Sequence, residues 1–314
     1  MTSCSPAIVV VGSLNADLVV RVARFPSPGE TVRGSAFDVF AGGKGGNQAC
    51  AAARLGAAVA MAGQVGSDSH GAWLRAQLRE AGADVSRVAT DDGISSGVAL
   101  ITTDADGENE IVVIAGANGT FTPDRLAPSL AAIRGARVLL LQLEIPVATV
   151  ERAAVEARGA GVSVILDPAP AAPIPDQLLG LASIVTPNET ELCLLASDTA
   201  PAAPLSRQNI DDLAGVLLSR GAHQILVKRG ASGARLVTAA GAQDFPTVAV
   251  AAVDTTAAGD AFNGALATCL ADRRPLDEAI RFACAAATLS VTRAGAQASM
   301  PTRTEVEELL SNQR

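Results

Sequence analysis

Residues 253–264 read Val-Asp-Thr-Thr-Ala-Ala-Gly-Asp-Ala-Phe-Asn-Gly, and this stretch predicts a helix that begins after a turn of small residues. The amides of Ala257, Ala258 and Gly259 would be unpaired in the first turn, where they form a cup for an anion. Asp260 projects from the same turn. A carboxylate beside bound negative charge suits proton abstraction from an alcohol during phosphoryl transfer. The alternative is an ordinary helix start with an acidic first turn.

A second glycine-rich stretch lies at residues 41–48, which read Ala-Gly-Gly-Lys-Gly-Gly-Asn-Gln ahead of an alanine-rich helical run to Leu55. Glycines let a ligand approach the backbone closely, and Lys44 and Asn47 carry groups that can contact it. The pattern is not a P-loop, which needs Gly-x-x-x-x-Gly-Lys-Ser/Thr. A flexible turn before a helix is an equally good interpretation of these residues alone.

Short apolar runs alternate with helical patterns along the chain, which predicts an α/β fold with a doubly wound, mainly parallel sheet flanked by helices. The expected strands cover residues 8–11, 59–63, 138–142, 162–167, 183–186 and 224–228. The expected helices cover residues 46–55, 70–81, 146–158, 210–220 and 259–271. We expect a single domain over residues 1–314.

Two segments interrupt this alternation, at about residues 16–41 and 96–115. The first contains Pro26, Pro28 and Gly29, and the second alternates around an acidic turn, which is a hairpin signal. We expect them to form a small antiparallel β lid over a ligand pocket. Two surface hairpins without a function are the alternative.

Polar side chains follow several expected strands, at the edge where open α/β sheets bind ligands. Asn15 and Asp17 face the same side of an extended chain and can grip adjacent sugar hydroxyls, although an Asx-rich turn explains them equally well. Asn188 and Glu191 are neighbours on a starting helix. A carboxylate there can hold Mg²⁺ through water, whereas a capping box is the plainer interpretation.

Composition favours a cytoplasmic protein that acts on small molecules. The net charge of −8, the 3% of aromatic residues and the absence of tyrosine argue against nucleic-acid binding. The five cysteines, Cys4 among them, show no metal-ligand spacing and indicate reduced thiols. No stretch resembles a signal peptide or a membrane span, so we expect no membrane association.

Seven motifs, in order, resemble those of the ribokinase-like (phosphofructokinase-B-type) carbohydrate kinases. They lie at residues 12–17 (GSLNAD), 28–31 (PGET), 42–48 (GGKGGNQ), 116–118 (GAN), 142–144 (QLE), 188–191 (NETE) and 254–260 (DTTAAGD). The resemblance runs from Ile8 to about Pro301 and implies the fold and lid expected above.

The resemblance also implies roles for individual residues. Asp260 corresponds to the catalytic base, and Ala257, Ala258 and Gly259 correspond to the anion hole. The sugar-binding set, besides Asp260, corresponds to Asn15, Asp17, Gly43, Lys44, Asn47 and Glu144. The nucleotide-binding set corresponds to Asn188, Lys228, Gly230, Ala258, Gly259 and Cys284. Glu191 corresponds to the water-mediated Mg²⁺ contact. The positions that enclose K⁺, partly through backbone carbonyls, correspond to Asp254, Thr256, Ser290, Arg293, Gly295 and Ser299.

Three positions depart from the commonest family pattern. Gly46 replaces the usual alanine, Lys228 stands where threonine is common, and Cys284 stands where histidine or asparagine often lies near the adenine.

The resemblance therefore implies ATP-dependent phosphorylation of the 5-hydroxyl of D-ribose, with Mg²⁺ and K⁺, by a homodimer that forms through its lids. A kinase for deoxyribose, another pentose or a nucleoside is the first alternative. The second is a catalytically silent sugar-binding regulator, which the presence of Asp260 and of the glycine cup disfavours.

Overall fold

The computed structural model describes residues 6–200 and 204–312, so that Cys4 lies outside the described residues. A nine-stranded sheet forms its centre, in the order β13-β12-β11-β10-β9-β8-β1-β4-β5. The strands from β5 to β11 run parallel, and β12 and β13 add an antiparallel hairpin at one edge. Their bounds are β1 Ile8–Val11, β4 Val59–Gly66, β5 Asp84–Asp91, β8 Val138–Leu141, β9 Ser163–Leu166, β10 Ile184–Val185, β11 Gln224–Lys228, β12 Ala234–Thr238 and β13 Gly241–Phe245.

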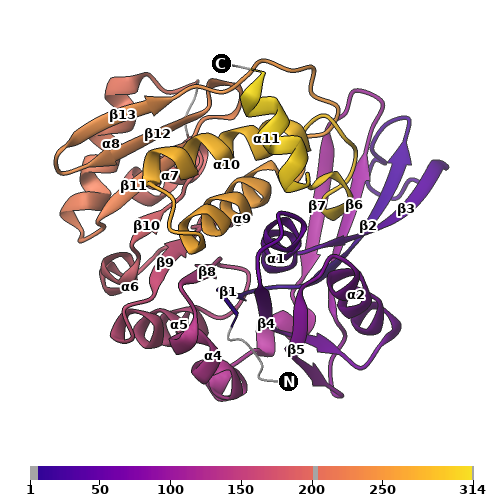
Figure 1. Cartoon of the computed structure of the whole chain (residues 1–314). Coiled ribbons are helices and arrows are strands. Elements are labelled where there is room, and N and C mark those ends of the chain that lie inside the picture. Colours follow the sequence, from indigo (N-terminus) through magenta and orange to yellow (C-terminus); the bar gives the residue numbers. More distant parts are fainter. Residues whose placement is uncertain (1–5, 201–203, 313–314) are drawn as a thin grey trace.

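Helices cover both faces of this sheet (Figure 1). Alternate residues of β1 serve the two cores: Ile8 and Val10 pack in one, and Val9 and Val11 in the other. The first core includes residues of α1 Lys44–Arg54, α2 Ser69–Glu80, α9 Ala258–Ala271, α10 Leu276–Ser290 and α11 Arg303–Ser311. The second includes residues of α3 Pro123–Leu126, α4 Leu130–Gly135, α5 Val147–Gly159, α6 Asp176–Leu181, α7 Glu189–Ser197 and α8 Arg207–Ser219. The predicted doubly wound α/β fold is confirmed.

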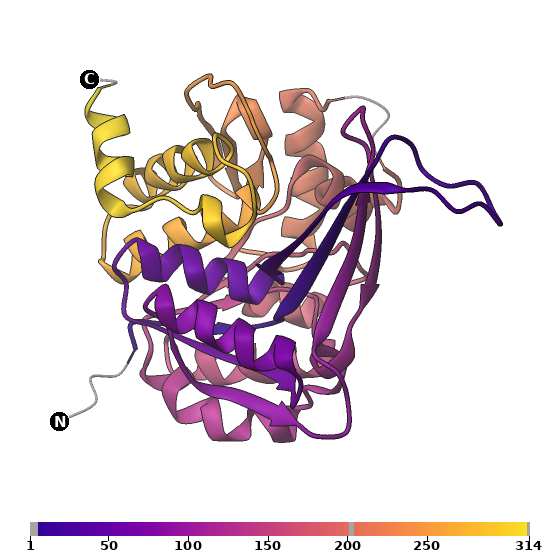
Figure 2. The same cartoon turned by 90° about the vertical axis from the view of Figure 1, so that its right-hand side faces the viewer.

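A second sheet of four strands, in the order β3-β2-β6-β7, stands along one flank of the molecule (Figure 2). Its strands are β2 Asn15–Val22, β3 Gly34–Gly42, β6 Gly97–Thr103 and β7 Asn109–Ile114. Each segment expected in the lid supplies one antiparallel pair, and the inner strands β2 and β6 join the two pairs in parallel. Asp17 and Val113 share one face of this sheet, whereas Leu18, Leu100 and Val112 share the other.

The structure adds elements that the sequence did not indicate. The edge strand β5, the β12–β13 hairpin and helix α10 lie in none of the ranges expected above. Helix α10 is buried over most of its length and rich in alanine. No helix in the described part of the chain has the length and apolar character that a membrane crossing requires.

Candidate active site

Polar side chains from distant parts of the chain meet at the carboxyl ends of the parallel strands. Glu144 follows β8, Asp167 follows β9, and Lys228 ends β11. The first turns of α1 and α9 reach the same place, because Asn47 of α1 bonds Asp260 of α9. This is the edge where open α/β sheets bind ligands.

The start of α9 has the open geometry expected of an anion cup. Its N-cap residue Ala257 has a left-handed backbone (φ 58°), and no side chain caps the helix. The amide of Ala258 makes only a long bond of 3.3 Å to the carbonyl of Thr255. The amides of Ala257 and Gly259 have no acceptor among the described residues. These donors are available to a negatively charged group.

Asp260 lies in the first turn of α9 and is 4% exposed. Its carboxylate accepts hydrogen bonds from Asn47 Nδ2 (2.9 Å) and Gln48 Nε2 (3.0 Å) of α1. Burial raises the pKa of Asp260 to about 6, against the opposing charge of Lys44 and with a smaller contribution from Asp167. A carboxylate with this pKa is ionised at neutral pH and is a better proton acceptor than an ordinary aspartate.

The residues of the expected sugar set surround this carboxylate. Asp17 projects from β2 over Gly42, where a Cβ would lie 2.0 Å from Asp17 Oδ2. Burial, followed by the charges of Glu144 and Asp260, raises the pKa of Asp17 to about 7. Asn47 Oδ1 is buried and has no hydrogen-bond partner among the described residues. A sugar hydroxyl bound beside these carboxylates would donate a hydrogen bond to this unpaired oxygen.

The same region is held in place by a set of side-chain contacts. Glu144 accepts bonds from Ser13 Oγ (2.5 Å) and from the amide of Lys44 (2.9 Å), which fixes the turn that carries Gly43. Asn118 Nδ2 donates to Asn15 Oδ1 (2.8 Å). Gly43 has φ 82°, a conformation that a side chain would disfavour.

Lys44 lies among several carboxylates. Burial favours loss of its charge, but Asp260, Asp167 and Glu144 outweigh this effect, with a further contribution from Glu191, and raise the pKa of Lys44. The side chain is therefore a permanent cation at physiological pH.

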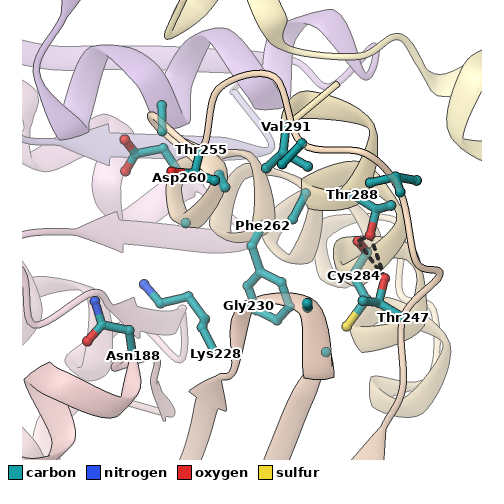
Figure 3. Close-up of a pocket in the computed structure, with 18 of the residues that line it drawn as sticks. Asn188, Lys228, Gly230, Thr247, Thr255, Asp260, Phe262, Cys284, Thr288 and Val291 are labelled. Carbon is teal, nitrogen blue, oxygen red and sulfur yellow. Dashed lines mark hydrogen bonds between the residues drawn. The ribbon is translucent and has the colours of Figure 1, made fainter. Parts of the chain in front are cut away.

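A cavity of about 480 Å³ opens from Asp260 along α9 and α10 (Figure 3), a volume typical of ligand pockets. Lys228 and Asn188 lie at one end, whereas Thr247, Thr288 and Cys284 lie at the other (Figure 3). Gly230, Ala258 and Gly259 also line it. Burial raises the pKa of the Cys284 thiol to about 12, so this residue offers a neutral, apolar surface.

Asn188 and Glu191, which the sequence places near Mg²⁺ or in a capping box, do form a capping box. Asn188 Oδ1 accepts from the amide of Glu191, and Glu191 Oε2 accepts from the amide of Asn188, both at 2.7 Å. Glu191 Oε1 has no hydrogen bond from the described residues, which leaves it available to a hydrated cation. Among the described residues, no group of three or more His, Cys, Asp or Glu side chains could hold a metal ion unaided.

The structure brings together the two loops of the expected K⁺ site. Asp254 accepts from the amides of Thr256 (2.9 Å) and Gly295 (2.8 Å), and the amide of Val253 donates to the carbonyl of Val291 (2.7 Å). The side chains of Ser290 and Ser299 bond nearby carbonyls, while Arg293 pairs with Glu305. Backbone carbonyls of the two loops and the charge of Asp254 can attract a cation there.

Two members of the site were absent from the predicted set. Asp167 is 1% exposed and accepts from both Gln48 Nε2 (2.9 Å) and Lys228 Nζ (2.8 Å). Gln48 in turn links Asp167 to Asp260. Asp167 directly follows a strand and Gln48 ends the second glycine-rich stretch, so their positions carried a signal, but their pairing depends on the assembled fold.

The comparisons with known proteins agree with this geometry. Residues 5–303 match the family model described as pfkB family carbohydrate kinase. The chain is 41% identical to a ribokinase of Haemophilus influenzae, over 97% of this chain and 98% of that protein. It is 39% identical to a ribokinase of Bacillus subtilis, over 97% and 99% of the two chains.

A solved structure extends the comparison to the fold. The structure of Arabidopsis thaliana ribokinase complexed with ribose and ATP matches with a TM-score of 0.91 and 36% identity, over 98% of this chain and 99% of the other. The family model and these relatives together show that the chain belongs to the pfkB family of carbohydrate kinases.

Proposed function

We propose that the protein transfers the γ-phosphoryl group of ATP to the 5-hydroxyl of D-ribose, giving D-ribose 5-phosphate and ADP. One observation carries this proposal: buried Asp260 lies at the open start of α9, between the carboxylates and amides of the sugar pocket and the 480 Å³ cavity. The relatives named ribokinase, and the one solved with ribose and ATP, support the choice of both substrates.

The sugar-binding residues, the base Asp260 and the amides of α9 have separate roles in the proposed reaction. Asp17, Asn15 and Asn47 bind sugar hydroxyls and orient the ring toward Asp260. Asp260 takes the proton of the 5-hydroxyl as its oxygen forms a bond to the γ-phosphorus, and the bond to the ADP oxygen breaks. The amides at the start of α9 stabilise the charge on the transferred group.

The nucleotide occupies the large cavity in this proposal. Asn188, Lys228 and Gly230 contact its phosphates and ribose, and Cys284 lies beside the base. The free oxygen of Glu191 would hold Mg²⁺ through water. The cation would supply charge neutralisation at the phosphates of ATP.

K⁺ would lie between the joined loops, attracted by the charge of Asp254 and held partly through backbone carbonyls. The residues that would enclose it are Asp254, Thr256, Ser290, Arg293, Gly295 and Ser299. The chain's own contribution is structural, because the Asp254–Gly295 contact ties the loop after α10 to the turn that carries the anion cup. A cation there would hold the amides of the anion cup in position. This matters because such donors stabilise a transition state only when they already point at the place where charge develops.

A coupled assay of ADP release tests the proposal across pentoses, deoxyribose, hexoses and nucleosides, at constant ionic strength with K⁺ or a bulky organic cation. We expect the highest kcat/KM with D-ribose and a higher kcat with K⁺. A preference for deoxyribose, another pentose or a nucleoside would reassign the substrate within the family. No ADP release with any acceptor would support a sugar-binding regulator, and equal rates in both cations would exclude the K⁺ site.

We also propose that residues 1–314 form a single domain with a lid over about residues 16–41 and 96–115, and that the protein is a homodimer through its lids. The face of the lid sheet opposite Asp17 exposes Phe37, Val39, Leu100 and Val112. An exposed apolar patch of this kind marks an interaction site. Because the proposed reaction consumes ATP, we place the protein in the cytoplasm.

A further inference from the structure

Lys228 has a position that binding the nucleotide alone does not explain. It ends β11, and its ammonium lies 2.8 Å from Asp167 Oδ1 and 4.0 Å from Glu191 Oε2. A Cβ on Gly259 would lie 3.3 Å from Lys228 Nζ. The ammonium therefore adjoins the first turn of α9, beside the amides that form the anion cup.

A bound nucleotide would give the ammonium of Lys228 a second negatively charged partner besides Asp167. Among the described residues that line the cavity, the carboxylates are Asp167, Glu191 and Asp260, and the cations are Lys44 and Lys228. A nucleotide triphosphate adds several negative charges, and phosphoryl transfer spreads charge over the equatorial oxygens of the moving group. Lys228 is 12% exposed in its side chain, so its charge acts with little screening.

From this geometry, and resting on the proposed function, we propose that Lys228 is a catalytic cation that contacts the transferred phosphoryl group, with Asp167 as its positioning residue. In the step itself, Asp260 takes the proton of the sugar hydroxyl, the bond from the sugar oxygen to phosphorus forms, and the bond to the ADP oxygen breaks. Lys228 donates hydrogen bonds to the oxygens of the group in transit and stabilises their charge.

Asp167 positions Lys228 and links it to the base. Its second oxygen accepts from Gln48 Nε2 (2.9 Å), and the same amide donates to Asp260 Oδ1 (3.0 Å). The chain Lys228–Asp167–Gln48–Asp260 thus fixes the distance between the cation and the proton acceptor. Gly259 leaves the space that the ammonium needs beside the cup.

Variants separate this role from a purely structural ion pair. Lys228→Met removes the charge and leaves the buried Asp167 carboxylate without its cation, with only the hydrogen bond from Gln48, so we expect both the melting temperature and kcat to fall. Asp167→Asn in the same chain removes the stranded charge, while its side-chain oxygen can still accept from Gln48. We expect the double variant to recover melting temperature but to keep a kcat about 10²-fold below that of the unaltered protein, the loss typical of one transition-state donor.

A matched control removes a paired cation outside the cavity. Arg235 bonds Asp211 and Asp244 at 2.7–2.8 Å and is 8% exposed. Arg235→Met should lower the melting temperature without changing kcat. The acceptor used is the one with the highest turnover in the substrate screen, so a wrong sugar does not affect this test.

The outcomes are distinct. Recovery of both melting temperature and kcat in the double variant would overturn the catalytic role and leave a structural ion pair. A kcat that stays low while sugar affinity is unchanged supports it, and Lys228→Arg should then restore part of the rate. Absence of turnover in the unaltered protein would instead overturn the proposed function.

Discussion

Asp260 combines deep burial with two amide donors, and its raised pKa leads to a measurable pH dependence. With a pKa of about 6, the carboxylate is protonated below that pH and cannot accept the sugar proton. We expect protonation of Asp260 alone to lower kcat/KM for ribose about tenfold per pH unit below about 6, with a plateau above about 7.

Replacing Asp260 by asparagine tests the base directly. The change keeps the shape but places an amide nitrogen against Asn47 or Gln48, both of which donate, so unfolding should become easier by about 1–3 kcal/mol. We expect turnover to fall about 10²–10⁴-fold while ribose binding, measured by calorimetry on the same preparation, persists. Turnover within about threefold of the unaltered protein would show that Asp260 is not the base.

Asp17 illustrates a conflict between binding and stability. Its pKa rises from 3.8 in the unfolded chain to about 7 in the fold, so the folded state holds the proton more tightly. Folding stability therefore decreases as the pH rises through this window, and the loss is complete above about 7. Asp17→Asn should raise the melting temperature at pH 8 but not at pH 4, and should weaken ribose binding. An unchanged affinity for ribose would make Asp17 a structural residue.

At the scale of elements, the packing of α1 against α9 sets the geometry of the base. A Cβ on Gly264 would lie 2.6 Å from Ala51 Cβ and 2.9 Å from the carbonyl of Gln48. Gly264→Ala should therefore force the helices apart, lower the free energy of unfolding by about 1–3 kcal/mol and reduce kcat.

Gly215 provides the matched control, because it lies in the exposed part of α8 and a Cβ there meets nothing within 4 Å. Gly215→Ala should stabilise the protein by about 0.5–1 kcal/mol and leave kcat unchanged. If Gly264→Ala melts and turns over like the unaltered protein, the contact between α1 and α9 does not position Asp260.

The sequence predicted those elements whose signal is local. Continuous apolar runs located β1, β8 and β11, and the small residues around Gly259 located the start of α9. Helix α10 was not predicted, because its burial depends on neighbours from α9 and α11. The pair Asp167–Lys228 was not predicted either, because it also depends on the assembled fold. These two side chains are 61 residues apart in the sequence, and the strand order brings them together.

At the scale of the whole molecule, the exposed apolar face of the lid determines how copies associate. Val112 is 61% exposed and lies across the sheet from Leu100 and Val39. Val112→Asp should convert the proposed dimer into a monomer in light-scattering measurements. Val216→Asp, on α8 and 40% exposed, makes the same change away from the lid and should leave the dimer intact. A monomeric unaltered protein, or a dimer with Val112→Asp, would contradict association through this face.

The missing cap of α9 has a consequence for motion. Helices α2, α7, α8 and α11 each begin with a side chain that accepts a backbone amide, whereas α9 begins at Ala257 with none. The phosphate of a bound nucleotide would supply the acceptor that the chain omits. Substrate thus supplies acceptors for these amides, so that the amides of Ala257 and Gly259 should exchange with solvent faster in the free protein than when the reactants are bound.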